Sequence, residues 1–507
     1  REEANAFARL VASPESKSLV HLFFAQRKPV VPLDISRDKS PARVTPREIK
    51  SIGIVGGGLM GAGIATVMLK AGLEVVIKEI DEKAADAAKT RVARNLGSKT
   101  AGAGAGTSVP RLVVTTSWDA FSNLDMVIEA VLENVKLKQE IMKTMAEKTP
   151  THCILATNTS TINIDLVASL IPREHYEQGR VIGAHFFSPA HIMPLFEIVQ
   201  TSSTSPAVVD ACIKLAKKVK KTPVVVGNCA GFAVNRMYFP QGQIATFLVT
   251  SLGIHPYDVD RAMESFGVPM GAFRLLDLVG LDIGVAVGGV YDMAYADRSY
   301  SDGLLPLMLN AGRKGQKSGA GFYKYDKDSG DRTAKKDNEE LNKFIDQIRR
   351  DQQRKGKLIA NDMKLTDQQI VEMVLLPCVN EGCRILAEKV VANASDLDIC
   401  SVFGMGFPQY RGGLMYWANQ SCGGPRGIME RLKAMREMSG GNVSLFAPSH
   451  ALLQLVRAQC LDLQAPPKPI RQPGLPDDIV IVSAYRTAVG RAYRGGLKDT
   501  PVDDLMA

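Results

Sequence analysis

The chain has 507 residues, of which 45% are hydrophobic and 23% are charged, as in a globular protein with three or four domains. No stretch approaches the roughly 18 consecutive apolar residues that span a bilayer. The net charge of +9 is spread along the chain and suits a polyanionic small molecule, and no recognised nucleic-acid-binding motif accompanies it. Eight scattered cysteines, with no C-x-x-C pair and no zinc-ligand spacing, argue against a metal site or disulfide framework and favour reduced thiols.

The first 48 residues are predicted to be a linker. Residues 1–28 carry apolar side chains at helical spacing and should form one or two helices. A segment punctuated by Pro29 and Pro46 follows and marks a domain boundary. Short β-branched runs then alternate with helical patterns through residues 49–229, which predicts an α/β domain of Rossmann type built from βαβ units.

The segment from Gly56 to Gly61, GGGLMG, fits the G-x-G-x-x-G pattern of dinucleotide-binding loops. It follows a predicted strand and opens an apolar predicted helix, as this motif requires. Gly56 permits the tight turn, Gly58 lets backbone N–H groups approach a pyrophosphate, and Gly61 allows close packing of helix on strand. The phosphates would lie at the N-terminus of the helix, where unpaired N–H groups bind anions. The loop, with Met60 among its contacts, therefore predicts a bound dinucleotide.

An acidic residue at the end of the second predicted strand indicates which dinucleotide is bound. Glu79 lies 23 residues after Gly56, close to the acidic position of the same fingerprint. Its carboxylate can accept hydrogen bonds from both ribose hydroxyls and would repel the 2′-phosphate of NADP. The sequence therefore favours NAD, although Lys78 beside Glu79 weakens the discrimination.

Five polar residues follow in an order that suits removal of hydride from a secondary alcohol. His185 ends the apolar strand VIGAHFF, where open α/β sheets bind ligands, and Glu197 lies in the apolar strand LFEIV, where an unpaired carboxylate is costly. Asn158 and Ser160 follow the strand CILAT, and Asn235 begins the helical region. A strand histidine is more often structural, and polar residues after strands often only cap helices. Their order behind a dinucleotide loop nevertheless favours a base, its carboxylate partner and substrate hydrogen-bonding groups.

Residues 230–326 and 365–465 are predicted to be two copies of one all-α domain, joined by a charged linker and helix over 327–364. Three anchors recur at a spacing of 137 residues: Pro240 with Pro377, Phe266-Gly267 with Phe403-Gly404, and Arg274 with Arg411. The pair Asp258 and Asp260 recurs as Asp396 and Asp398, shifted by one residue. The two copies should bury each other's apolar faces.

Seven motifs in order resemble the 3-hydroxyacyl-CoA dehydrogenase family: GGGLMGAGIA, VIEAVLENVKLKQ, ATNTSTI, GAHFFSP, LFEIV, GFAVNR and GQKSGAGFYKYD. The longer pattern over residues 1–460 resembles the multifunctional proteins of fatty-acid β-oxidation, above all the plant peroxisomal ones. It is also similar to bacterial fatty-oxidation α subunits and the mitochondrial trifunctional α subunit. The resemblance implies oxidation of an L-3-hydroxyacyl-CoA thioester by NAD, in a peroxisome (glyoxysome) or, alternatively, the mitochondrial matrix.

The resemblance also assigns roles to individual residues. His185 would be the general base, Glu197 would orient it, and Ser160 and Asn235 would bind the hydroxyl and thioester oxygens of the substrate. Further cofactor contacts are implied for four residues: Glu133, Lys138, Asn158 and Lys317. Without the resemblance, Glu133 and Lys138 are equally well explained as an ion pair on the surface of a helix.

The sequence departs from the family pattern at two places. Ser188 stands where the family commonly has asparagine. The segment after Glu79 is expected to lack the helix and basic residues that relatives carry near CoA, with a low-complexity, mobile loop over 97–110 instead. The resemblance is therefore weakest for the residues that would contact CoA.

Both ends resemble parts of neighbouring enzymes. Residues 1–28 are similar to the linker helix after an enoyl-CoA hydratase domain, and DIVIVSAYRT, within the linker and strand of 466–507, is similar to the first strand of a thiolase. The expected partners are hydratase and thiolase units of the same protein or complex, and homo- or hetero-oligomers stay open. Two other functions also stay open: a catalytically silent scaffold that joins those units, and a dehydrogenase of short hydroxy acids that lack CoA.

Overall fold

The computed structural model describes residues 2–34, 46–97, 111–326, 334–356, 359, 363–441 and 443–458, all within one compact unit, Arg1–Gln464. The loop predicted over 97–110 lies, beyond Gly97, outside these residues, as does the thiolase-like strand predicted within 466–507. None of the described helices is both long and apolar enough to cross a membrane.

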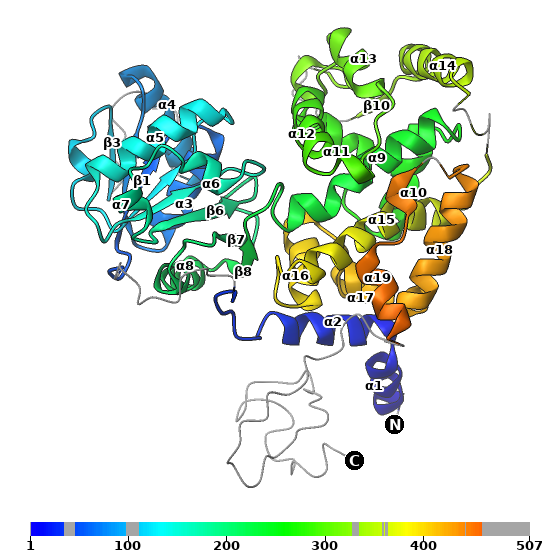
Figure 1. Cartoon of the computed structure of the whole chain (residues 1–507), viewed down its shortest axis with the longest axis horizontal. Coiled ribbons are helices and arrows are strands. Elements are labelled where there is room, and N and C mark those ends of the chain that lie inside the picture. The colour runs from blue at the N-terminus through cyan, green and yellow to red at the C-terminus, as the bar shows by residue number, and fades with distance from the viewer. Residues whose placement is uncertain are drawn as a thin grey trace. The chain divides into compact units, whose positions relative to one another are not determined.

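The first domain is built on an eight-stranded sheet of order β3-β2-β1-β4-β5-β6-β7-β8 (Figure 1). Every neighbouring pair is parallel except β6 and β7, which are antiparallel. The strands are β1 (Ser51–Val55), β2 (Glu74–Lys78), β3 (Leu112–Thr115), β4 (Met126–Glu129), β5 (Ile154–Thr157), β6 (Val181–Phe186), β7 (Leu195–Gln200) and β8 (Thr222–Gly227). The predicted Rossmann-type sheet is confirmed, with β3 and β8 as edge strands that the sequence patterns did not single out.

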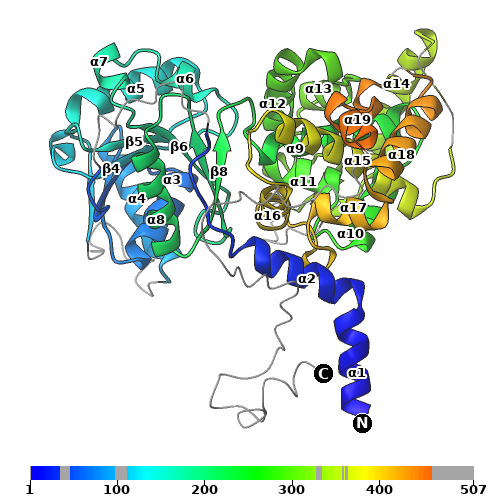
Figure 2. The same ribbon diagram turned by 60° about the horizontal axis from the view of Figure 1, so that its bottom comes forward.

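Helices cover both faces of this sheet (Figure 2). They are α3 (Leu59–Lys70), α4 (Glu82–Asn95), α5 (Val135–Lys148), α6 (Ile164–Val167), α7 (Arg173–Tyr176) and α8 (Pro206–Lys218), with the 3₁₀-helix η1 (Asp119–Phe121). Buried side chains of α3, α4 and α8 form one apolar layer with Ile52 and Ile54 of β1, and those of α5 and α6 form the layer on the other face. Strands with two covered faces explain why the β-branched runs are almost continuously apolar.

A helix does follow Glu79, so the expected helix-free segment is wrong for the described residues. The Asp81 carboxylate accepts a hydrogen bond from the Ala84 N–H at 2.7 Å and caps α4. This helix carries four basic residues: Lys83, Lys89, Arg91 and Arg94. Alanines in its sequence place a narrow apolar face on the sheet, which is why the segment lacks a strong apolar pattern.

The remaining described elements are almost all helical, as predicted. The amino-terminal linker forms two helices, α1 (Glu2–Ala12) and α2 (Pro14–Ala25). The helices after the sheet are α9 (Val234–Thr250), α10 (Pro256–Phe266), α11 (Ala272–Val279), α12 (Leu281–Ala294), α13 (Leu304–Asn310), α14 (Asn338–Arg354), α15 (Asp367–Ala387), α16 (Ala394–Met405), α17 (Leu414–Ser421), α18 (Gly424–Met438) and α19 (His450–Arg457). Short elements join them: η2 (Ala296–Arg298), η3 (Gln316–Ser318), β9 (Tyr323–Lys324), β10 (Lys335–Lys336), η4 (Gln409–Arg411) and η5 (Ser444–Phe446).

The two helical copies share a buried aspartate that caps a following helix. Asp260 of α10 accepts hydrogen bonds from two backbone N–H groups in the first turn of α11, and Asp398 of α16 does the same for α17, at 2.8 to 3.0 Å. Gly271 and Gly413 precede the capped helices, and a Cβ at either would lie 2.3 Å from the aspartate. These matched contacts support the duplication because they need the same residue types in both copies.

Two of the three anchors at a constant spacing are not structural equivalents. Gly267 ends α10 with φ 115°, whereas Gly404 lies inside α16, which ends at Gly406 instead. Arg274 lies in α11, but Arg411 lies in η4, before the helix that corresponds to α11. The second copy has a longer connection between its capping aspartate and its capped helix, so a single spacing cannot align both.

The capping aspartates also differ in their third hydrogen-bond partner. The Tyr323 hydroxyl donates to Asp260 at 2.9 Å from within the first copy. In the second copy the partner comes from the linker, because His21 Nε2 of α2 lies 2.9 Å from Asp398 Oδ2. The His21 ring stacks on Tyr416, with centroids 4.3 Å apart. Helix α2 is therefore held on the second copy by a buried polar contact.

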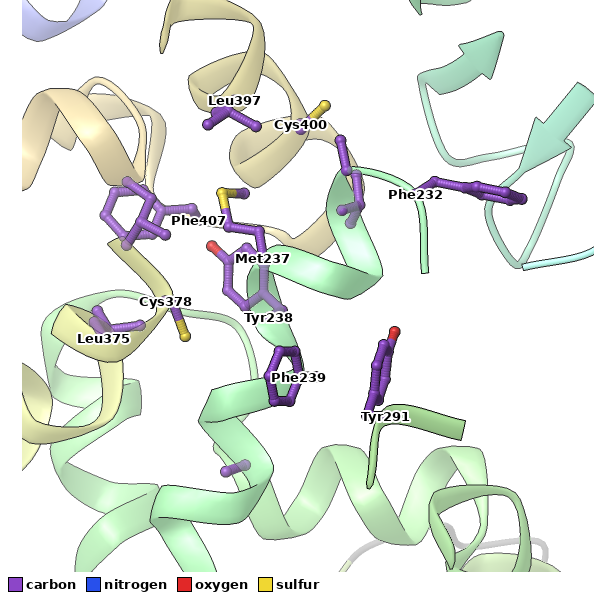
Figure 3. Close-up of a cluster of buried hydrophobic side chains, with 14 of the residues drawn as sticks. Phe232, Met237, Tyr238, Phe239, Tyr291, Leu375, Cys378, Leu397, Cys400 and Phe407 are labelled. Atoms are coloured by element: carbon purple, nitrogen blue, oxygen red, sulfur yellow. The ribbon is translucent and has the colours of Figure 1, made fainter. Parts of the chain in front are cut away.

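The two copies bury their apolar faces against each other, as predicted. Helices α9 and α15 pack together, and each contains its proline, Pro240 or Pro377, in the interior of the helix. Figure 3 shows side chains of this shared core: Met237 and Tyr238 of α9, Leu375 and Cys378 of α15, Leu397 and Cys400 of α16, and Phe407. All are buried, so each copy supplies the surface on which the other folds.

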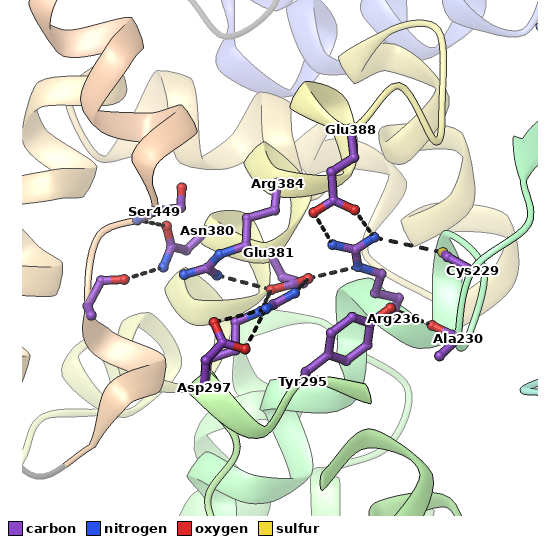
Figure 4. Close-up of polar contacts among 12 residues, drawn as sticks. Cys229, Ala230, Arg236, Tyr295, Asp297, Asn380, Glu381, Arg384, Glu388 and Ser449 are labelled. Carbon is purple, nitrogen blue, oxygen red and sulfur yellow. Dashed lines mark hydrogen bonds and ion pairs between the residues drawn. The ribbon is translucent and has the colours of Figure 1, made fainter. Parts of the chain in front are cut away.

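A buried ionic network also joins the copies (Figure 4). Glu381 of α15 is 1% exposed and accepts from Arg236 of α9 at 2.8 Å and from Arg298 of η2 at 2.8 and 3.0 Å. Arg384 donates to the same carboxylate at 3.0 Å, and Glu388 receives both terminal nitrogens of Arg236 at 2.6 and 2.7 Å. Three guanidinium groups thus donate hydrogen bonds to one buried carboxylate, close to where α9 begins.

Candidate active site

The glycine loop has the geometry of a dinucleotide cradle. Gly56 has φ 96°, which favours glycine, and a Cβ on Gly61 would lie 1.8 Å from the Gly56 carbonyl oxygen. Gly58 is the N-cap of α3, and a Cβ there would meet nothing within 4 Å, so the space in front of the helix N-terminus is open. The three predicted glycine roles agree with these positions: a turn, an open approach and close packing.

Glu79 lies at the mouth of this loop. Its carboxylate accepts hydrogen bonds from the N–H groups of Gly57 at 2.6 Å and Ile80 at 3.2 Å. The ammonium of Lys78 lies 5.2 Å from the centre of the Trp118 ring. The negative charge predicted to select NAD is therefore beside the helix N-terminus where the phosphates were predicted to bind.

His185 and Glu197 are brought together by strand register. In the antiparallel pair of β6 and β7, residue 185 stands directly opposite residue 197. His185 Nδ1 lies 2.7 Å from Glu197 Oε2, and the two side chains are 5% and 0% exposed. A carboxylate buried at this distance holds the ring in one orientation and keeps the proton on Nδ1. The contact between the two residues, which the sequence could only suggest, is present.

Glu197 also caps the helix that begins the helical region. Its Oε1 atom accepts hydrogen bonds from the N–H groups of Ala233 at 3.2 Å and Val234 at 3.0 Å, where α9 begins. The positive end of a 17-residue helix thus faces the buried carboxylate. Sequence reasoning missed this second role, because a cap supplied from a distant strand leaves no local signal.

His185 lines a cavity of about 660 Å³. Because Nδ1 is hydrogen-bonded to Glu197, Nε2 is the ring nitrogen that can act on a ligand in this cavity. The rings of Phe187 and Phe232 flank the imidazole, with centroids 4.4 and 5.7 Å away. Six of the thirteen predicted site residues line this cavity, namely Met60, Glu133, Lys138, Asn158, Ser160 and His185, together with Ser188 and the α12 residues Asp282, Ile283, Ala286, Val287 and Val290. A single space is therefore lined by the base and by Met60 of the dinucleotide loop.

Asn235 and Asn158 position the rim of this cavity. The Asn235 amide donates to the Ser160 carbonyl at 3.2 Å, so these two predicted residues are neighbours. The Asn158 amide oxygen accepts from the Phe186 N–H at 2.9 Å and holds the end of β6 that carries His185. Ser160 lines this cavity and also a second one, which Asn235 lines too and which continues into the helical region.

The ion pair of Lys138 is buried, so its interpretation as a helix-surface pair is wrong. Lys138 is 1% exposed, and its ammonium lies 2.8 and 3.0 Å from the two oxygens of Glu129 and 3.1 Å from Glu133. Glu133 also accepts hydrogen bonds from the Thr159 hydroxyl and, at 3.3 Å, from the Ser160 N–H. Glu129, which sequence reasoning did not single out, is fully buried at the end of β4 and anchors this cluster.

Lys317 lies apart from the other cofactor candidates. Its ammonium is 2.5 Å from the carboxylate of Asp282, at the start of α12, and both side chains are partly exposed. Asp282 lines the cavity, whereas Lys317 does not. Among the described residues, no group of three or more His, Cys, Asp or Glu side chains could hold a metal ion, and the seven described cysteines are free thiols.

Comparisons with known proteins point to one family. Residues 51–229 match the model of the 3-hydroxyacyl-CoA dehydrogenase NAD binding domain, and residues 231–325 match that of its C-terminal domain. The (S)-3-hydroxybutyryl-CoA dehydrogenase PaaH1 from Ralstonia eutropha is 33% identical, with a TM-score of 0.50, over 55% of this chain and 100% of that chain. The dehydrogenase part of multifunctional enzyme 1 from C. elegans, 24% identical, shares the fold over 86% of this chain and 96% of its own, with a TM-score of 0.60.

Curated relatives extend the similarity to longer proteins. The glyoxysomal fatty acid beta-oxidation multifunctional protein MFP-a of Cucumis sativus is 44% identical over 452 residues, which cover 87% of this chain and 59% of that protein. The peroxisomal bifunctional enzyme of Homo sapiens is 33% identical over 448 residues, which cover 85% of this chain and 60% of that protein. The chain thus spans about three fifths of the length of the curated relatives that it matches.

Proposed function

Because the chain belongs to the 3-hydroxyacyl-CoA dehydrogenase family, we propose that it oxidises an L-3-hydroxyacyl-CoA to the 3-ketoacyl-CoA, with NAD as the hydride acceptor. The observation that carries this proposal is the pair of His185 and Glu197, which meets at 2.7 Å beside a cavity that Met60 of the glycine loop also lines. A base held by a carboxylate next to a dinucleotide loop is the arrangement that removal of hydride from an alcohol requires.

The described residues fit NAD. The open space in front of Gly58 at the N-terminus of α3 accommodates a pyrophosphate, and the carboxylate of Glu79 lies where it can accept from ribose hydroxyls. Asn158 and Glu133 line the cavity beyond the loop, and Lys138 would act through Glu133, because its ammonium is engaged by two carboxylates. When bound, NAD accepts the hydride from the substrate carbon.

In the proposed reaction, Nε2 of His185 takes the proton of the 3-hydroxyl group. The Nδ1–H group donates to Glu197, so the ring keeps its acceptor nitrogen toward the substrate. As the imidazolium forms, the buried carboxylate stabilises its charge without taking the proton itself. The two hydrogen bonds that Glu197 accepts at the N-terminus of α9 hold that carboxylate in place.

Ser160 and Asn235 are proposed to bind the oxygens of the substrate. Both residues lie at the rim where the two cavities meet, and the Asn235 amide already donates to the Ser160 carbonyl. A hydroxyl and an amide can donate to the 3-oxygen and to the thioester oxygen. Holding these two oxygens would place the hydrogen on C3 in line for transfer.

We extend the proposal to the organisation and setting of the protein. Residues 1–48 would be a linker, 49–229 the NAD-binding domain, 230–326 and 365–465 the two helical copies, 327–364 the charged connection, and 466–507 a second linker with its strand. The names of the relatives favour a peroxisome. The resemblance of the two ends of the sequence to parts of neighbouring enzymes is the basis for proposing hydratase and thiolase units in the same protein or complex. Helix α2, docked through His21 and Asp398, would be the path along which an upstream unit is attached.

A spectrophotometric assay tests the activity. The purified chain is mixed with NAD and L-3-hydroxybutyryl-CoA or a longer L-3-hydroxyacyl-CoA, and NADH absorbance is followed. We expect NADH from the L-thioesters, much less from the D-enantiomers and none from free 3-hydroxybutyrate. Oxidation of the free acid would indicate a dehydrogenase of short hydroxy acids. If no L-thioester is oxidised, the proposal is wrong and a scaffold role is favoured.

Replacing Glu79 with alanine tests the choice of cofactor. The change removes the acceptor proposed for the ribose hydroxyls, so the Kd for NAD should rise at least about tenfold while kcat with saturating NAD changes less. Discrimination against NADP should fall, because the repelling charge is gone. Fluorescence titration with NADH and NADPH measures both effects. An unchanged Kd for NADH would contradict the assigned ribose contact.

A further inference from the structure

The first helical copy contains a chamber of about 550 Å³, and beyond Ser160 and Asn235 its walls have no role in the proposed reaction. It lies between α9, α11, α12 and α13. Its apolar walls are formed by these residues: Phe239, Leu275, Leu276, Val279, Ile283, Val287 and Leu305. Val279 and Ile283 are exposed among these walls, and a concave apolar surface of this size suits an apolar ligand.

The chamber is continuous with the active-site cavity. Ser160 and Thr161 line both spaces, and so do Ile283 and Val287 of α12. Asn235, the first polar residue of α9, stands at this junction through its hydrogen bond with Ser160. An acyl-CoA whose thioester lies at Ser160 therefore has an apolar space directly ahead of its tail.

The chamber has a definite depth along α9. The α9 residues that line it run from Asn235 to Thr246, an axial distance of about 16 Å at 1.5 Å per residue. That distance fits roughly a dozen carbons of an extended chain, since each bond of about 1.5 Å advances a zigzag by a little less than its length. The chamber is thus long enough for a medium or long acyl tail.

The far end of the chamber is polar. Tyr300 and Asp302 line it there, next to Thr246, and the Thr250 hydroxyl donates to Asp302 at 2.7 Å. The Leu304 N–H donates to the other oxygen of Asp302 at 2.9 Å. An apolar tail that reached Asp302 would remove water from its carboxylate, which is costly. This end should therefore limit how long an acyl tail can be and still bind more tightly for each added carbon.

Glycines on two of its helices line the middle of the chamber and leave it open. Gly242 of α9 and Gly288 of α12 both line it, and a Cβ built on either would meet nothing within 4 Å. Helix interiors usually avoid glycine, because glycine costs about 1 kcal/mol relative to alanine. Neither residue has the left-handed backbone that would explain glycine, so open volume is the remaining benefit.

We propose that this chamber binds the acyl tail of the substrate and that Gly242 and Gly288 determine the chain length that the enzyme accepts. The inference rests on the proposed function and goes beyond it, because it assigns a chain-length preference. Tails of up to roughly a dozen carbons beyond the reacting centre would be buried between α9 and α12, and longer tails would meet the polar end.

The first test is the chain-length series of the unmodified protein. The kcat/KM for L-3-hydroxyacyl-CoA thioesters should rise from the four-carbon substrate toward the long ones. Each added pair of methylenes should give at least about threefold, below the roughly 14-fold of complete burial. The rise should stop once the tail passes the depth of Thr246. A flat series would overturn the proposal.

The second test narrows the chamber from each side. Gly242→Leu and Gly288→Leu should each lower the ratio of kcat/KM for the sixteen-carbon over the four-carbon substrate by at least tenfold, and Gly242→Ala should lower it less. Ala387→Leu, which adds three carbons at an exposed position at the end of α15, should leave the ratio unchanged. Thermal unfolding of each variant shows whether it is folded.

The outcomes separate this proposal from the proposed function. If both leucine variants fold and keep the ratio of the unmodified protein, the chamber does not bind the tail, although the dehydrogenase assignment stands. If the unmodified protein oxidises no L-3-hydroxyacyl-CoA of any length, the proposed function itself fails. A lowered ratio in both leucine variants but not in Ala387→Leu supports the chamber.

Discussion

Replacing His185 with glutamine is expected to lower kcat by about 10³-fold or more while leaving the Kd for NAD unchanged. The glutamine amide can still donate to Glu197, so β6, β7 and the start of α9 should keep their arrangement. It cannot take a proton at neutral pH, so the 3-hydroxyl group keeps its proton. Steady-state NADH formation and NADH binding by fluorescence measure the two quantities separately.

A second histidine provides the control for this variant. His175→Gln changes a histidine in α7, outside the active-site cavity, and should leave kcat within about twofold of the original. A His185→Gln protein that keeps most of its turnover would show that another group is the base. Loss of NAD binding as well would mean that His185 acts through the structure of the cavity.

Replacing Glu381 with alanine is expected to lower the free energy of unfolding by about 3–5 kcal/mol. The change removes the carboxylate that Arg236, Arg298 and Arg384 all contact at 2.8 to 3.0 Å, and Arg236 and Arg298 are buried. Burial would raise the pKa of Glu381, but the arginines hold it below its usual value. Its stabilising effect is therefore present above the usual pKa of a glutamate and is lost as the pH falls through the lowered value.

Chemical denaturation followed by circular dichroism measures this effect. Glu340→Ala is the control, because Glu340 forms an ion pair of 2.6 Å with Lys343 on the exposed surface of α14 and its loss should change stability little. Equal stability losses in the two variants would show that burial of the network does not matter. The decrease in unfolding free energy caused by Glu381→Ala should also be smaller at acid pH, because the Glu381 carboxylate of the unmodified protein is then protonated.

Elements whose signal is local could be predicted from the amino-acid sequence. The glycine loop and Glu79 were predictable because phosphate and ribose binding need a turn, an open approach and an acid at set distances along one βαβ unit. The helical copies were predictable from their aspartates and prolines, although the anchors at Gly404 and Arg411 were wrong. Insertions shift a spacing without changing the fold, so a single offset could not align both copies.

The contacts between polar groups that are distant in the sequence depend on long-range packing. His185 faces Glu197 because β7 runs antiparallel in a parallel sheet, and a register between two strands is set by packing and turn geometry rather than by either strand's pattern. The same long-range packing turns Glu197 into the cap of α9 and buries Lys138 on Glu129. A buried charge is costly unless an opposite charge or a hydrogen-bonding group lies next to it. When that neighbour is far away in the sequence, no periodic pattern in the chain reveals it.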